Sequence, residues 1–107
     1  MSGIVNPIAA FEMWSDHPQF VLMKRMLHPS LCDLWIKDVD DATVCMAALV
    51  AMIRCSDLVI SHVTEWDVLR GVLARCYAVA EACGRIPSAY TTGERTVVRF
   101  ELQSVNA

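Results

Sequence analysis

Residues 42–53 read ATVCMAALVAMI, a stretch without a charged residue, a glycine or a proline. On a helical wheel its large side chains point in every direction, and Thr43 supplies the only hydroxyl group. A helix that is apolar on every face belongs inside a hydrophobic core. The stretch is too short to cross a bilayer, which needs about 20 residues. It therefore predicts a buried central helix, over about 41–55, with the rest of the chain packed around it.

Helices are also predicted on the N-terminal side of this stretch. Asn6 is a good helix cap and Pro7 suits the first helical position, so a helix is expected over about 7–15. A second helix over about 18–28 would end before the next proline, because the residue preceding a proline avoids the helical conformation. Residues 30–36 fit one further short helix.

The C-terminal side begins with a β-branched run at 58–63, which suits either a buried connection or a short strand. The strongest helical pattern of the chain follows over about 65–83, and Gly84 is its expected stop. Beyond Gly84 the apolar residues alternate, which predicts a β-hairpin over about 86–103.

Together these elements predict a mainly α fold with a minor β component. Four or five helices would form a bundle around the buried central helix, and the C-terminal β-hairpin would close the core. The 107 residues are expected to form a single domain over 1–107.

Composition favours a folded, cytoplasmic protein. The chain is 55% hydrophobic, which argues against disorder. Its net charge of −3 argues against sequence-independent binding to the phosphate groups of nucleic acid. Its five cysteines contain no Cys-x-x-Cys pair and lie largely in apolar helical runs, as reduced, buried thiols do. No signal peptide and no membrane span are visible.

The sequence contains no recognisable catalytic, metal or cofactor constellation. His28 and Cys32 have a ligand-like spacing, but Pro29 interrupts the helix that would align them. The glycines are scattered, so no phosphate-binding loop forms. His62 lies in an apolar connector without a second group placed beside it. We therefore expect neither an enzyme, nor a metal site, nor a cofactor.

An acidic run precedes the central helix and is the first candidate for a binding site. Its carboxylates are Asp33, Asp38, Asp40 and Asp41. One interpretation is helix capping, since carboxylates offset the positive end of a helix dipole. The other is electrostatic capture of a protein with a basic surface. The most specific form of this hypothesis is a phage or mobile-element inhibitor, for example an anti-CRISPR protein, that occludes a nucleic-acid-binding complex.

The alternative function is a winged-helix-like DNA-binding regulator. In that interpretation the last helix enters the major groove and the hairpin flanks it. The DNA contacts would come from Arg70 and Arg75 on the helix and from Arg95 and Arg99 on the hairpin. The acidic first turn of the same helix argues against this hypothesis.

A homodimer is a further expectation, by one of two surfaces. The first is a stripe of small residues on the last helix, at Gly71, Ala74, Ala78 and Ala82, which would allow a second helix to approach closely. The second is the exposed edge of the hairpin, which could pair with another chain. Good helix formation and simple closure of the core explain the same residues without a partner.

Overall fold

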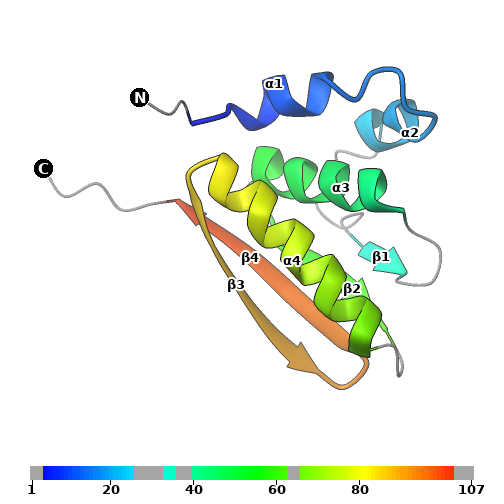
Figure 1. Ribbon diagram of the computed structural model, residues 1–107, viewed down its shortest axis with the longest axis vertical. Helices are drawn as coiled ribbons and strands as arrows, with labels where there is room; N and C mark the ends of the chain where they lie inside the picture. Colours follow the sequence, from blue (N-terminus) through cyan, green and yellow to red (C-terminus); the bar gives the residue numbers. More distant parts are fainter. Residues whose placement is uncertain (1–3, 26–32, 36–39, 63–65, 103–107) are drawn as a thin grey trace, which may run out of the picture.

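The computed structural model describes residues 4–25, 33–35, 40–62 and 66–102 (Figure 1). In chain order the elements are α1 (Pro7–Glu12), α2 (Phe20–Arg25), β1 (Asp33–Trp35), α3 (Asp41–Arg54), β2 (Leu58–Ser61), α4 (Trp66–Ala82), β3 (Arg85–Thr92) and β4 (Arg95–Leu102). Asp38, the end of the predicted second helix and the residues immediately before α4 lie outside the described residues.

The strands form one sheet in the order β1-β2-β4-β3. β1 runs parallel to β2, and α3 is the crossover between them. β4 pairs antiparallel with β2 on one side and with β3 on the other, so it lies inside the sheet. The hairpin is therefore part of a larger sheet and does not merely cover the core.

The predicted mainly α bundle is wrong, because the fold is mixed α+β. Residues 58–61 form a strand that pairs Leu58 with Val98, far along the chain. The short helix predicted over 30–36 is also wrong where the chain is described, since Asp33–Trp35 form β1. Strands of three and four residues are too short to show a period, and their pairing partners are distant in sequence. The sequence offered a strand at 58–63 only as an alternative to a buried connection, and the assembled sheet shows that β2 forms there and that β1 pairs with it.

α3 lies in the centre of the molecule, and its neighbours explain why its sequence lacks a polar face. α1 and α2 cover one side of α3, α4 packs along another, and the sheet lies beneath (Figure 1). Val44, Met46, Leu49 and Met52 are each at most 2% exposed. Three alanines, Ala47, Ala48 and Ala51, are equally buried, and their small side chains allow the neighbouring elements to approach closely.

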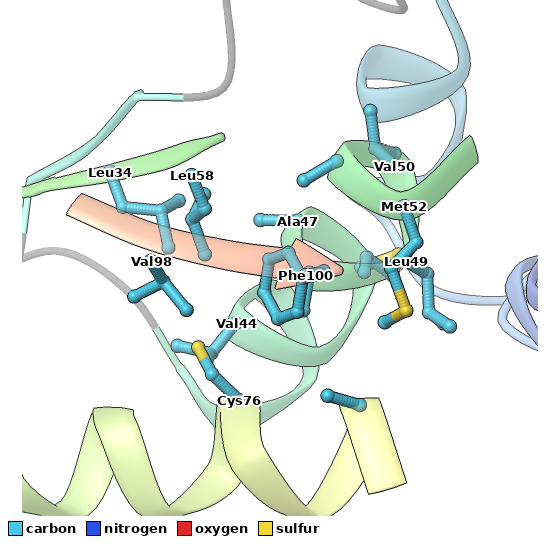
Figure 2. Packing of buried hydrophobic residues seen from close by; sticks show 14 of the residues in the cluster. Leu34, Val44, Ala47, Leu49, Val50, Met52, Leu58, Cys76, Val98 and Phe100 are labelled. Carbon is cyan, nitrogen blue, oxygen red and sulfur yellow. The ribbon is translucent and has the colours of Figure 1, made fainter. Parts of the chain in front are cut away.

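The inner face of the sheet completes this core. Figure 2 shows Leu34, Leu58, Val98 and Phe100 directed toward Val44 and Ala47 of α3 and Cys76 of α4. Along β4 the alternation follows the expected pattern, with Thr96, Val98 and Phe100 buried. Leu102 continues the same alternation but is 73% exposed, because it lies at the end of the strand.

Local sequence determines where several helices begin and end. The Asn6 side chain accepts hydrogen bonds from the backbone N–H groups of Ile8 and Ala9, which confirms the predicted cap of α1. Gly84 adopts φ +69° at the end of α4, where a glycine stop was expected. α3 instead ends at Cys55, a non-glycine residue with φ 55°. A cysteine rarely adopts the left-handed backbone conformation, so the sequence contains no signal for the end of this helix.

Candidate interaction surfaces

The carboxylates that open α3 already have partners within the chain. Asp40 is the N-cap, and its Oδ1 accepts a hydrogen bond of 2.7 Å from the Thr43 backbone N–H. Hydrogen bonds from the Thr43 side chain and from this backbone N–H lower the pKa of Asp40. His17 Nε2 lies 3.4 Å from Asp40 Oδ2, and Arg75 donates to Asp41 Oδ2 at 3.0 Å. The two carboxylates therefore stabilise the start of α3, while their side chains remain 62% and 82% exposed.

For the other two carboxylates of the acidic run, the structure describes only the backbone of Asp33. Asp33 is the first residue of β1, where its backbone pairs with Val59, and Asp38 lies outside the described residues. The described part of the chain thus does not bring the four carboxylates into one defined patch.

Replacing Asp40 by alanine should lower the free energy of unfolding by about 0.5–2 kcal/mol, because the cap of α3 is lost. Asp40→Asn should cost less, since asparagine also caps helices. The lowered pKa means that the carboxylate contributes fully above its unfolded pKa of about 3.9 and loses its contribution as the pH falls through its lower folded value. Urea unfolding at pH 7 and at pH 3 measures both effects. Equal stability of Asp40→Ala and wild type at pH 7 would contradict the capping role.

The four arginines of the DNA-binding hypothesis do not share a surface. Arg70 and Arg75 are exposed on α4, which covers the inner face of the sheet, whereas Arg95 and Arg99 alternate with the buried residues of β4 and point to the outer face. Three of the four also lie beside carboxylates. These are the pairs Arg70–Asp67 at 3.4 Å, Arg75–Asp41 at 3.0 Å and Arg99–Asp57 at 3.4 Å. Within the residues that the structure describes, no continuous basic face therefore joins α4 to the hairpin.

His62 is buried where β2 leads toward α4. Its Nε2 lies 2.9 Å from the Thr96 hydroxyl, which in turn lies 2.9 Å from the Thr91 hydroxyl. The ring packs at an angle against Trp66, with centroids 4.9 Å apart. Nδ1 is buried and has no hydrogen-bond partner among the residues that the structure describes. These contacts join β2, β4 and α4, which is a structural role for this histidine.

An apolar groove of about 360 Å³ lies between α1, α3 and α4. Residues from the N-terminal segment and from all three helices line it: Val5, Ala10, Met13, Trp14, Cys45, Leu49, Val79, Ala82 and Cys83. The groove exists because α1 and α4 each pack on α3 without meeting along their lengths (Figure 1). A hydrogen bond of 2.9 Å from the Val5 N–H to the Ala82 carbonyl joins the two walls.

The thiols in and near the groove are poor nucleophiles. Burial raises the pKa of Cys45 and Cys83, both of which line the groove, and it raises the pKa of Cys76 beneath them to about 12. Since the thiolate is the reactive form of cysteine, these side chains act at neutral pH as small apolar groups. The groove is therefore suited to apolar contact and not to thiol chemistry.

The outer face of the sheet is the second candidate surface. No described helix covers it, and on it Tyr90 and Val97 are cross-strand neighbours, with Val59 beside Val97. These residues line a shallow hollow of about 570 Å³, together with Thr92, Glu94 and Arg95. Tyr90 is 54% exposed, so an aromatic ring stands open on this face.

Sequence reasoning missed both surfaces. The sequence predicts the helices that supply Trp14, Val79 and Cys83, but the gap left between those helices depends on how they pack. Of the two surfaces suggested for a homodimer, the small-residue stripe on α4 is exposed. The free edge of the hairpin belongs to β3, which includes Pro87. Within the described residues no group of histidine, cysteine or acidic side chains is arranged to hold a metal ion, and no helix is long and apolar enough to cross a membrane.

Comparison with known proteins finds no matching family model, no matching curated protein and no matching solved structure, so the function has to be argued from the chain itself.

Proposed function

We propose that this chain is a protein-binding module that acts without catalysis, and that the groove between α1, α3 and α4 receives apolar side chains of a partner protein. The proposal rests on one observation: the groove is apolar, and some of the apolar side chains that line it are exposed to solvent. Met13 and Val5 line the groove and are 83% and 39% exposed. Exposed apolar side chains beside an apolar groove are typical of a protein interaction site.

The volume and chemistry of the groove fit an amphipathic helix or short segment of the partner. Its volume is at the lower end of the range of about 300–1,000 Å³ that is usual for binding pockets. Helix-in-groove recognition uses a few apolar anchors spaced along one helix face. Methionine adapts its shape readily, so Met13 can close over such an anchor.

Met13→Lys should weaken partner capture about tenfold to a hundredfold. The loss corresponds to the roughly 1.5–3 kcal/mol that burial of one large apolar side chain contributes. Val21→Lys is the matched control, because Val21 is 60% exposed on α2 and does not line the groove. The measurement is quantitative affinity capture from the source cell with wild type and both variants. Equal recovery of the same partner by wild type and Met13→Lys would overturn the proposal.

A narrower form of the proposal is that the module is an inhibitor, of the anti-CRISPR kind, which uses the acidic run to occlude a basic, nucleic-acid-binding surface. The exposure of Asp40 and Asp41 supports it, since paired carboxylates at the surface still attract a basic partner. Asp38→Asn combined with Asp41→Asn leaves the Asp40 cap in place. Capture that falls with this double variant and with rising salt would favour the inhibitor form over apolar docking alone.

A further inference from the structure

We infer that the groove between α1, α3 and α4 selects a basic amphipathic helix, whose apolar anchors enter the groove while a lysine or arginine of the same helix pairs with the carboxylates at the start of α3. This inference rests on the proposed function and names the chemistry of the partner segment. It joins the groove and the carboxylates into one site, which a single helix occupies.

The start of α3 forms one end of the groove. Asp41 lies one helical turn before Cys45, a residue that lines the groove. Arg75 lies one turn before Val79, which lines the groove from α4. The hydrogen bond of 3.0 Å from Arg75 to Asp41 therefore connects α3 to α4 at this end. Burial is the main cause of the raised pKa of Cys45, and the charges of Arg75 and Asp41 also act on it, so both charges lie beside the groove.

Asp40 lies near the same end of the groove, beyond the Trp14 ring. Trp14 lines the groove and makes an edge contact with the His17 ring, at a centroid distance of 6.3 Å. His17 and Asp40 in turn line a polar hollow of about 330 Å³, whose lining also includes Gln19 and Thr43. The apolar groove and this polar hollow thus adjoin across the contact between the two rings.

In both pairs that hold these carboxylates, the carboxylate is the more exposed member. The Asp41 side chain is 82% exposed, against 46% for Arg75. The Asp40 side chain is 62% exposed, against 20% for His17. Asp16, in the turn that follows α1, is exposed as well. A partner that approaches this end of the groove therefore meets carboxylate oxygens first, and these favour a cation.

The opposite end of the groove, around Cys83, carries no such excess of negative charge. Glu81 and Arg85 line a common hollow beside it, and Arg54 is the charged residue in the last turn of α3. Among the described residues near this end, positive charges thus outnumber negative ones. The groove is therefore acidic at one end only.

Helical spacing allows one partner segment to engage both parts of the site. Helix-in-groove recognition uses apolar anchors at i, i+3 or i+4 and i+7. A basic residue one turn from the first anchor lies about 5.4 Å farther along the helix. This matches the single turn that separates Asp41 from Cys45 on α3. A helix with glutamate at that position would bring like charges together, which disfavours it.

Three fluorescein-labelled, amidated peptides test the inference. They share leucine anchors at i, i+4 and i+7 and differ only at two positions within one turn of the first anchor, which are lysine, glutamine or glutamate. Fluorescence anisotropy at low salt should show that wild type binds the lysine peptide about tenfold more tightly than the glutamate peptide. The preference should shrink in about 1 M salt, where charges are screened beyond about 3 Å.

Asp41→Asn should remove most of this preference, because it takes away the exposed carboxylate and leaves the Asp40 cap in place. Asp67→Asn is the matched control, since Asp67 is also an exposed carboxylate beside an arginine but lies about 18 Å from Val79 along α4. It should bind all three peptides as wild type does. Equal affinity for the lysine and glutamate peptides, no binding of the lysine peptide, or an unchanged preference in Asp41→Asn would overturn the inference.

Met13→Gln separates this inference from the proposed function, because it removes an apolar lining group without adding a charge. It should weaken binding of all three peptides by a similar factor and leave the lysine preference intact. If Met13→Gln weakens binding whereas Asp41→Asn changes nothing, the groove binds a partner that is not basic, and only this inference fails. If Met13→Gln binds every peptide as wild type does, the proposed function fails together with it. Circular dichroism should show that every variant is folded.

Discussion

Replacing Leu58 by alanine should lower the free energy of unfolding by about 2–5 kcal/mol, the usual cost of emptying a buried leucine site. Leu58 is fully buried in β2, between β1 and β4, and its side chain lies among Leu34 and Val98 (Figure 2). The surrounding strands are fixed by their ladder hydrogen bonds, so the cavity cannot collapse easily. Urea unfolding measures the loss.

Leu22→Ala is the matched control, since it makes the same chemical change at a position that is 51% exposed on α2. Its effect should stay within about 0.5 kcal/mol. Similar effects of the two replacements would contradict the placement of β2 inside the core. Amide hydrogen exchange supplies an independent check, because residues 58–61 should exchange as slowly as the rest of the core if they are a central strand.

Thr96→Val should destabilise the protein by about 1–3 kcal/mol, even though valine has nearly the same shape as threonine. The Thr96 hydroxyl is the hydrogen-bond partner of His62 Nε2, and both residues are buried. Without the hydroxyl, the imidazole would have no partner at Nε2, in addition to Nδ1, which has none among the described residues. A buried polar atom without a partner costs more than the hydrogen bond itself contributes.

A double-mutant cycle tests this explanation. His62→Leu combined with Thr96→Val removes both polar partners, and the pair should be less destabilised than the sum of the single variants. Thr91→Val is the control at the exposed end of the same chain of hydroxyl groups, and its effect should be smaller. Strict additivity of the His62 and Thr96 changes, measured by urea unfolding, would show that the hydrogen bond does not couple them.

The sequence by itself determined the features that depend on neighbouring residues. The charge-free run became the buried helix α3, because a segment without a polar side chain on any face can be stable in water only when other elements surround it. Asn6 and Gly84 marked helix ends because capping and a left-handed backbone are local properties. The alternation along β4 likewise follows from the two-residue period of a single strand.

Only the tertiary structure decided the fold class and the two candidate surfaces. β1 is a strand because it pairs with β2, and β2 is a strand because it also pairs with β4. Pairing between distant segments leaves no periodic signal in three or four residues. The groove depends on the spacing between α1 and α4, and the acidic end of α3 is engaged by His17 and Arg75, which lie far from it along the chain. The local sequence pattern determines which face of a helix or strand is apolar. The packing distances between these elements determine which apolar surfaces remain accessible to a partner.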